Sequence, residues 1–151
     1  MSVTTPPTER WLHPYLVPLG RFFFALIFLV SSVGHFSRPT IDYAASHGVP
    51  LASLAVPLAG LVALAGGLSI ALGYHARAGA LLLVLFLVPV TLTMHRFWNV
   101  ADPEMAQIQR VMFLKNVSML GGALLIAYFG SGPLSLDRRA AALPAPPRVQ
   151  P

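Results

Sequence analysis

The stretch from Val111 to Gly130 is apolar enough to lie in lipid, yet Lys115 and Asn116 interrupt it side by side. A lysine in mid-bilayer costs about 2.5 to 3.5 kcal/mol on insertion scales, so this ammonium group needs an explanation. One explanation is that Lys115 lies near a helix end, where its long stem lifts the ammonium toward the interface. The other is that polar side chains of neighbouring helices meet it, since Asn116 has no such stem.

Further polar residues are expected at the same membrane level. His35 follows the first apolar segment, and His95 ends the third, with Trp98 and Asn99 just beyond it. Taken singly, each is explained as a helix-end residue or an interfacial anchor. Because three segments bring polar residues to one depth, we predict a shared pocket near the outer surface. Its members would be His35, His95, Lys115 and Asn116, with Trp98 and Asn99 as further ligand-binding candidates.

Two imidazoles, an ammonium and an amide would suit a ligand with oxygen acceptors, such as a quinone head group, an oxyanion or a polar lipid. No apolar segment contains Asp or Glu, which excludes a proton relay through carboxylates in the spans. Two histidines can ligate haem iron, but here both end helices near water, and this disfavours haem. Cysteine is absent, so the chain itself supplies no thiolate metal site and no disulfide, and no metal site is predicted.

Four apolar segments must position these residues. The chain has 151 residues, of which 56% are hydrophobic and 10% charged, and this composition is typical of a membrane protein. A hydrocarbon core about 30 Å thick needs roughly 20 helical residues. The sequence therefore predicts an all-α, four-helix transmembrane bundle in contact with the lipid bilayer. The expected helices cover residues 16–34, 52–73, 77–95 and 111–130, with a tail over 1–15 and a flexible tail over 131–151.

The charge distribution predicts the orientation. Four crossings place both termini on one side, and that side holds more of the arginines than the opposite one. By the positive-inside rule, both termini are expected in the cytoplasm of a bacterium, with the bundle in its plasma membrane. The arginines are scattered among apolar segments and form no basic stripe, which argues against nucleic-acid binding.

Small residues at four-residue spacing predict where helices meet, because they let two backbones approach closely in lipid. The second segment has an unbroken ridge of five, and the fourth segment has a shorter notch of two. Arg21, near the cytoplasmic end of the first segment, is about 21 Å from His35 and cannot join the outer pocket. It is expected either to bind lipid phosphate or to bond another helix end. The packing residues are Ala55, Ala59, Ala63, Gly67 and Ala71, then Ser118 and Gly122.

Several short motifs in this order resemble the DoxX family of membrane proteins. They are "LGRFFFALIFLVSSVGHF", "LAGGLSIALGYHARAGALLLVLFL", "HRFWN" and "KNVSMLGGALLIAYFGSGPLSLDRR". The resemblance implies a four-helix protein of the bacterial inner membrane, in some members associated with quinone-linked sulfur oxidation or with thiol and oxidant defence. Members of that family often have a glutamate in the second span, where "GLVALAGG" has no acid.

Three functions are compatible with the sequence. The first is a membrane subunit of a redox system that holds a quinone or docks an oxidoreductase partner, and we favour it. It would contribute binding rather than a catalytic centre, because no dinucleotide fingerprint, cysteine cluster or carboxylate pair is present. The second is a small transporter or channel subunit, which would need a homo-oligomer to form a pore. The third is a structural or interaction subunit whose polar residues only bond the helices together.

Overall fold

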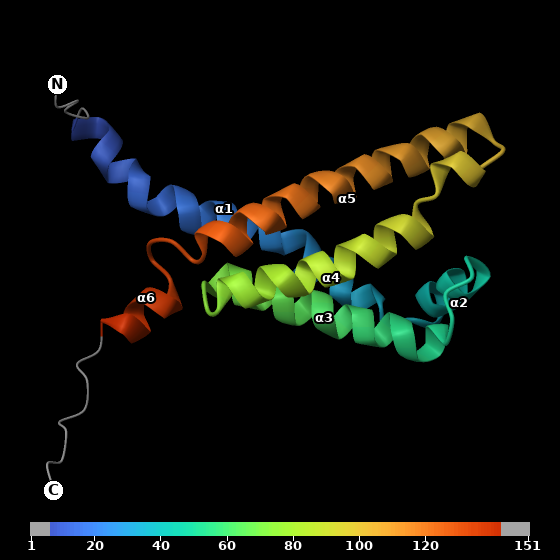
Figure 1. Cartoon of the computed structure of the whole chain (residues 1–151), viewed down its shortest axis with the longest axis horizontal. Helices are drawn as coiled ribbons and strands as arrows, with labels where there is room; N and C mark the ends of the chain where they lie inside the picture. The colour runs from blue at the N-terminus through green and yellow to red at the C-terminus, as the bar shows by residue number, and fades with distance from the viewer. Residues whose placement is uncertain (1–6, 143–151) are drawn as a thin grey trace, which may run out of the picture.

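The computed structural model describes the backbone of residues 7–142 and the side chains of residues 14–142. This part of the chain is helical, with four long helices running alongside one another and three short ones at the ends (Figure 1). The elements are α1 (Pro7–Gly34), α2 (Arg38–Ser46), α3 (Ala52–Leu72), α4 (Ala76–Met94), η1 (Phe97–Asn99), α5 (Pro103–Phe129) and α6 (Leu136–Ala141).

The four long helices are each able to cross a membrane. The apolar spans are Pro14–Gly34, Ala52–Leu72, Ala76–Asn99 and Pro103–Phe129, with mean hydropathies between 1.6 and 2.1. The prediction of an all-α bundle with four transmembrane helices is confirmed. We call the end that holds α6 and the α3–α4 turn the inner end, and the end that holds α2 and η1 the outer end. These names follow the predicted orientation, which stays a prediction.

Two helices begin earlier than the apolar pattern indicates. α1 begins at Pro7, inside the expected N-terminal tail, and residues 1–6 lie outside the described part. α5 begins at Pro103 rather than 111, because Asp102 caps it by accepting a hydrogen bond from the Met105 amide at 2.8 Å. The apolar window misses this first part of α5 because its residues are polar. The residues between the first two expected helices also contain a helix, α2.

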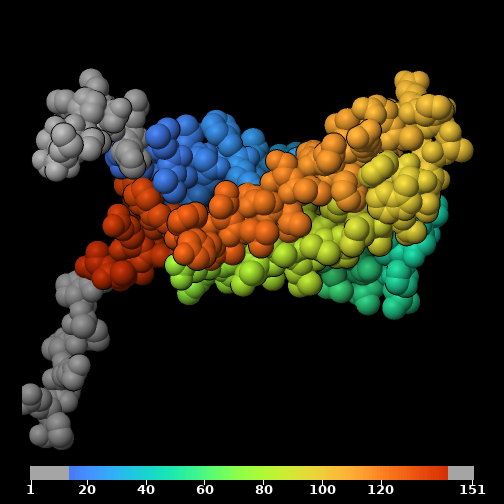
Figure 2. All heavy atoms as spheres, turned by 45° about the horizontal axis from the view of Figure 1, so that its top comes forward, coloured from blue at the N-terminus to red at the C-terminus, as the bar shows by residue number. Residues whose placement is uncertain are grey.

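Residues 131–142, which were expected in a flexible tail, include a helix in the structure. α6 forms here, with Ser135 as its N-cap, and the Asp137 amide donates to the Gly73 carbonyl at 3.1 Å. Figure 2 shows this segment, in red, lying against α1 and the end of α5. The backbone after α5 therefore packs onto the inner end of the bundle. Residues 143–151 of the expected tail lie outside the described residues.

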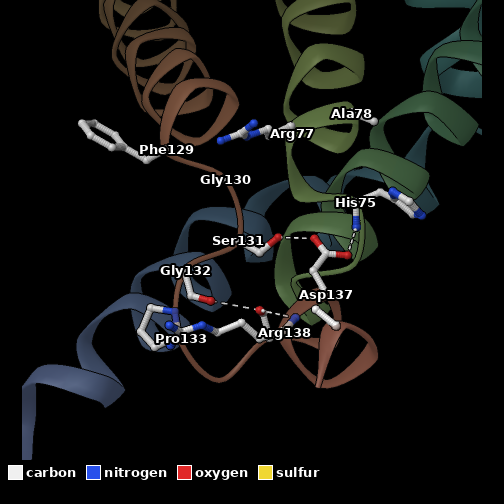
Figure 3. Close-up of a pocket in the computed structure, with 12 residues that line it drawn as sticks. His75, Arg77, Ala78, Phe129, Gly130, Ser131, Gly132, Pro133, Asp137 and Arg138 are labelled. Atoms are coloured by element: carbon white, nitrogen blue, oxygen red, sulfur yellow. Dashed lines mark hydrogen bonds between the residues drawn. The ribbon is translucent and has the colours of Figure 1, made fainter. Parts of the chain in front are cut away.

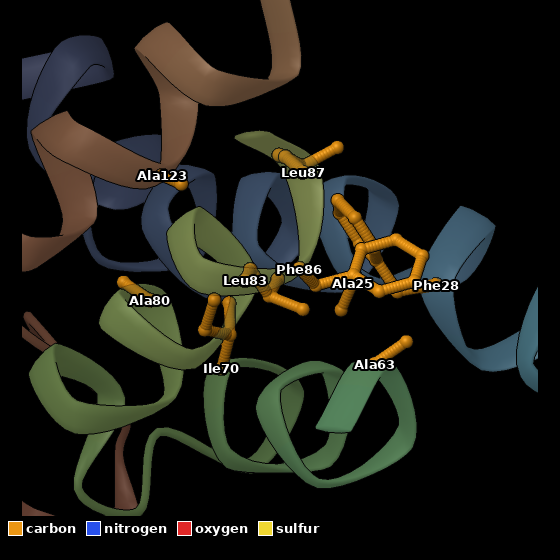
Figure 4. Close-up of a cluster of buried hydrophobic side chains, with 9 residues drawn as sticks. All are labelled: Ala25, Phe28, Ala63, Ile70, Ala80, Leu83, Phe86, Leu87 and Ala123. Carbon is orange, nitrogen blue, oxygen red and sulfur yellow. The ribbon is translucent and has the colours of Figure 1, made fainter. Parts of the chain in front are cut away.

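The core lies where α1, α3, α4 and α5 meet. Its buried side chains are small or aliphatic apart from Phe28 and Phe86, whose rings make an edge-on contact at 6.3 Å between centroids. Large apolar side chains are exposed on all four long helices, as expected where the surrounding solvent is lipid. The core (Figure 4) consists of Ala25, Phe28, Ala63, Ile70, Ala80, Leu83, Phe86, Leu87 and Ala123.

α3 and α4 approach most closely near their inner ends. A Cβ added to Gly66 would lie 2.7 Å from the Leu83 side chain and 2.9 Å from the Gly79 carbonyl oxygen. A Cβ on Gly79 would in turn meet the Ser69 side chain. Only glycine fits at this crossing, which is the arrangement expected when helices associate by close packing in lipid.

Candidate functional site

A cavity of about 350 Å³ lies at the outer end, between the end of α1, α2 and the outer halves of α3 and α4. Two features of the sequence open it. Ala55 and Ala59 line it from α3 with minimal side chains, and Pro89 lines it from α4. A proline within a helix lacks the amide that would bond the carbonyl four residues before, and so bends the helix. α3 and α4 therefore separate here, whereas they touch at the inner end.

His35 is the ionisable residue of this cavity. Its Cβ packs closely over Gly60, where an added Cβ would lie only 2.6 Å away. Its ring lies against Phe86 at 5.7 Å between centroids. Its Nδ1 is 2.9 Å from the Ser31 carbonyl oxygen, and since a carbonyl only accepts, Nδ1 is the donor. In the neutral ring Nε2 is then an acceptor.

The remaining polar groups of the cavity are hydroxyls. Thr93 lines it from α4 and donates its own hydroxyl hydrogen to the Pro89 carbonyl at 2.7 Å. Its oxygen keeps free lone pairs, so it too can accept a hydrogen bond. Thr40 lines the cavity from α2 and shares a hydrogen bond of 2.9 Å with Ser37. The cavity is thus an apolar space bordered by acceptors.

A second outer feature is a groove of about 430 Å³ between the α2–α3 loop and the start of α5. Arg96 closes one side by donating to the Thr93 carbonyl at 3.1 Å and to the His47 carbonyl at 3.4 Å. Asn99 also lines the groove. His95 is tied across to α5, with 2.8 Å between its Nδ1 and Gln109 Oε1. This bond connects the end of α4 to α5.

Trp98 is exposed and belongs to an aromatic group at the outer end. Its ring lies 5.0 Å from Phe97 and 5.8 Å from Phe113, each edge to face. Such a group, at the end of a membrane helix, has the form of an interfacial aromatic belt.

Lys115 and Asn116 face different surroundings, because neighbours on a helix point about 100° apart. Asn116 is buried and shares the inward stripe of α5 with Ala123. Lys115 lies on the exposed side, and its Nζ reaches back toward Met112 Sδ at 3.4 Å. It lies about 9 Å deeper than Gln109 by the helical rise, and its stem runs toward the outer end.

The structure does not bring the predicted pocket residues into one cavity. His35 lines the apolar cavity and Asn99 lines the groove, while His95, Lys115 and Asn116 line neither. The common depth expected from the sequence fails for Lys115 because α5 begins at Pro103 and so places this lysine further from the outer end. Within the residues described, no group of three or more His, Cys, Asp or Glu is placed to hold a metal ion.

The small residues of α3 lie in the bundle as the ridge requires. Ala63 and Gly67 are buried, and a Cβ on Gly67 would lie 3.0 Å from Leu29 of α1. Ala55, Ala59 and Ala71 are partly buried on the same side. On α5, Gly122 packs against the Phe24 ring of α1. A Cβ added to Gly122 would lie 2.7 Å from this ring. Ser118 is exposed, because it lies two positions from Asn116 and turns away from the inward stripe.

Arg21 is buried at the inner end, with 4% of its surface exposed. Its guanidinium donates to the Ser131 carbonyl and, at 2.9 Å, to the Leu134 carbonyl. A Cβ on Gly73 would fall 2.5 Å from its Nη1, so the arginine also packs beneath the end of α3. Of the two roles expected for Arg21, the structure places it in the bonding one, holding the segment after α5.

Asp137 holds the same segment from the other side. Its carboxylate accepts hydrogen bonds from the Ser131 hydroxyl and from the His75 amide, the latter at 2.9 Å (Figure 3). These hydrogen bonds, that of Ser131 first, lower the pKa of Asp137 below its ordinary value, because they favour the charged carboxylate. Arg21 and Asp137 together fasten residues 131–137 to α1 and to the α3–α4 turn. We call this arrangement the inner latch.

Comparison with known proteins identifies the relatives of this bundle. The SURF4 family model matches residues 52–141, from the start of α3 through α6. The chain belongs to the SURF4 family. "Inner membrane protein YphA" of Escherichia coli is 31% identical over 134 residues, covering 84% of this chain and 91% of YphA. "Inner membrane protein YqjF" of the same organism is 31% identical over 124 residues, covering 81% and 89%. No solved structure matches.

Membership in the SURF4 family overturns the resemblance to the DoxX family. The motifs behind that resemblance are short, and three of the four consist largely of glycine and apolar residues, which membrane helices of many families share. The SURF4 match instead extends continuously over α3, α4, α5 and α6. The association with sulfur and thiol oxidation rested on the DoxX resemblance and has no support without it. What stands is an integral membrane protein with four spans.

The inner latch was missed at the sequence level. Ser131, Gly73 and Asp137 lie among small residues that read as a turn and a tail. One signal was present: Ser135 followed by Asp137 and two arginines is a capped helix start with an acid in its first turn and bases in its last. The Gly66–Gly79 crossing was missed as well, although each glycine stands inside an apolar helix, where it needs a packing reason.

Proposed function

We propose that this protein is a ligand-binding subunit of the bacterial inner membrane that holds a lipid-soluble molecule with a hydroxyl-bearing ring, of the quinol type, in the outer cavity. The supporting observation is His35, a single imidazole at the border of a largely apolar cavity. A volume of about 350 Å³ is within the range of small-molecule sites, roughly 300 to 1,000 Å³. The names of the two relatives support the location.

The tautomer of His35 selects the ligand's head group. Because Nδ1 donates to the Ser31 carbonyl, the neutral ring offers Nε2 as an acceptor, and the Thr93 oxygen is an acceptor too. A hydroxyl group satisfies such acceptors, whereas a quinone carbonyl has no hydrogen to give. A second proton on the ring would turn Nε2 into a donor for that carbonyl. With a neutral His35 ring, the cavity should therefore prefer the quinol, which is the reduced form, over the quinone.

The experiment compares binding of ubiquinol-1 and ubiquinone-1 to the purified protein in detergent. Wild type should bind ubiquinol-1 saturably and at least threefold more tightly than ubiquinone-1 at pH 8. Ala59→Leu fills the cavity from α3 and should abolish binding. His35→Phe keeps an aromatic ring but removes the acceptor, and should weaken ubiquinol-1 binding about tenfold, as expected for one lost hydrogen bond in an apolar site.

The matched control is Ala65→Leu, the same substitution on the exposed side of the same helix. It should bind like wild type. If Ala59→Leu also binds like wild type, the cavity is not the site. If His35→Phe binds ubiquinol-1 unchanged, the role given to the imidazole is wrong. A partner oxidoreductase and a homo-oligomer stay predictions.

A further inference from the structure

A different cavity, of about 720 Å³, opens at the inner end between the start of α4, the end of α5 and α6. We infer that it binds a phosphate group, carried by an anionic phospholipid or free in solution, through Arg77 and Arg138. This site is separate from the outer cavity and does not depend on what binds there. Figure 3 shows both arginine side chains beside the Gly130–Pro133 segment, Arg77 near Gly130 and Arg138 near Pro133.

Within residues 14–142, neither guanidinium group is hydrogen-bonded. Arg77 and Arg138 are exposed, and in Figure 3 no hydrogen bond joins either guanidinium to another residue of the cavity. Arg77 lies over the backbone, with its Nε 3.0 Å from the position of a Cβ on Gly130. Glycine at this position leaves room for the guanidinium and for a group bound to it. Arginine suits a phosphate because its planar fork can donate two hydrogen bonds at once.

Among the described residues that line the cavity, the one acid does not compete for these arginines. Asp137 lines the cavity, but one of its oxygens accepts from the His75 amide and the other from the Ser131 hydroxyl. This carboxylate belongs to the inner latch. In the described part of the cavity the remaining charged side chains are cationic, so the potential there favours an anion.

Two backbone amides of the lining residues are candidate donors. Within residues 14–142, the amides of Ser131 and Gly132 donate no hydrogen bond, although both residues line the cavity. Arg21 holds the carbonyls of Ser131 and Leu134 from the opposite side, which fixes the course of this segment. A segment held by its carbonyls is ordered before a ligand arrives, so less conformational entropy is lost on binding.

The position of the cavity suits a lipid head group. It begins where the apolar helix α5 ends, at Phe129, and the exposed rings of Tyr128 and Phe129 mark an aromatic belt at that level. Phospholipid phosphates lie at this depth, and basic residues between membrane helices on the cytoplasmic side are known to hold them. Free phosphate would reach the same arginines from the aqueous side.

The test uses the full-length protein, purified in detergent and stripped of lipid, with binding measured by native mass spectrometry. The probes are dioleoylphosphatidylglycerol, inorganic phosphate, and dioleoylglycerol, which lacks the phosphate. The double variant Arg77→Gln/Arg138→Gln should bind dioleoylphosphatidylglycerol at least tenfold more weakly than wild type. Arg77→Lys keeps the charge but loses the planar guanidinium. Its affinity for dioleoylphosphatidylglycerol should lie between those of wild type and the double variant.

The matched control is Arg139→Gln, which lies beside Arg138 on α6. Arg139 is exposed and does not line the cavity. It should bind like wild type. Arginine-dependent binding of the phospholipid alone identifies the lipid as the source, and arginine-dependent binding of inorganic phosphate identifies the free anion. The inference is overturned if the double variant, with an unchanged melting temperature, binds both phosphate-bearing probes like wild type. Equal binding of dioleoylglycerol, or saturable binding of no probe, also overturns it.

Discussion

The two ends of this bundle are built in opposite ways. At the inner end, Arg21 and Asp137 bond the segment after α5 to α1 and to the α3–α4 turn, and α3 touches α4 through glycine. At the outer end, α3 and α4 are separated by a cavity, and His35 bonds only its own helix within the described residues. The inner latch thus uses polar groups to hold the chain together, whereas His35 leaves an acceptor available to a ligand in the outer cavity.

This contrast shows that a polar residue in a membrane helix has to be interpreted together with its partners. Arg21 was expected either to bind lipid phosphate or to bond another helix end. It is buried, and its Nη1 and Nη2 donate to the carbonyls of Ser131 and Leu134. Lys115 looked like a pocket residue and lies on the exposed side of α5. Acceptors lower the cost of burying a charge, and the inner latch supplies two carbonyls to Arg21, although its Nε has no hydrogen-bond partner within the described residues.

The largest effect is expected from breaking the inner latch at its arginine. Arg21→Met removes the donor to the carbonyls of Ser131 and Leu134 and leaves both without this partner. Hydrogen bonds from charged groups contribute about 1.5 to 3 kcal/mol each, so losing two should lower the free energy of unfolding by about 3 to 6 kcal/mol. Unfolding by denaturant titration in detergent measures this.

The control for Arg21→Met is Arg77→Gln, which removes a cation from the exposed surface of the same end. Its stability should match that of wild type within about 0.5 kcal/mol. Equal losses in the two variants would mean that Arg21 acts through general charge rather than through its two carbonyl bonds.

An intermediate effect is expected at the close crossing of α3 and α4. Gly66→Ala puts a Cβ within 3 Å of Leu83 and of the Gly79 carbonyl, and overpacking of this kind costs about 1 to 3 kcal/mol. Ala59→Leu adds more atoms to the same helix but directs them into the outer cavity, and should leave the melting temperature unchanged or raise it. Thermal unfolding of both variants measures the contrast.

Gly121→Ala serves as the control for the crossing, since a Cβ there meets nothing within 4 Å. It should be as stable as wild type or slightly more so. A larger loss for Ala59→Leu than for Gly66→Ala would show that the outer end is the tightly packed one and would reverse the comparison.

The smallest effect is expected from Asp137, and it depends on pH. The pKa of Asp137 is lowered in the folded protein, so its ionisation adds stability above the ordinary aspartate pKa of about 4, and this contribution is lost as the pH falls through the lowered value. The melting temperature of wild type should therefore exceed that of Asp137→Asn at pH 7, and the difference should shrink below about pH 4. A difference that is constant with pH would exclude the carboxylate charge as its cause.

The sequence was sufficient for the four spans because their apolar length is a local property. It was also sufficient for the face of α3 that carries Ala63 and Gly67, since small residues recur at a fixed interval. It was not sufficient for the start of α5, although Asp102 followed by Pro103 is a recognisable helix start. An apolar window gives no weight to a polar first turn.

Contacts between distant segments could not be predicted. Arg21 bonds Ser131, which is 110 residues further along the chain, and its acceptor is a backbone carbonyl that any residue could provide. Lys115 and Asn116 could not be assigned to a face without knowing which side of α5 meets α1 and α4. The phase of a helix is visible only where its apolar and polar residues alternate, and α5 is largely apolar around these two.

The bond between Arg21 and Ser131 also bears on biosynthesis. Arg21 enters the bilayer with the first helix, long before the ribosome has made Ser131 and Leu134. Until the last helix emerges, this guanidinium has to be accommodated by water, lipid phosphate or the insertion machinery. A nascent chain truncated before Ser131 would therefore carry an uncompensated cation, which gives cellular quality control a chemical mark of an unfinished molecule.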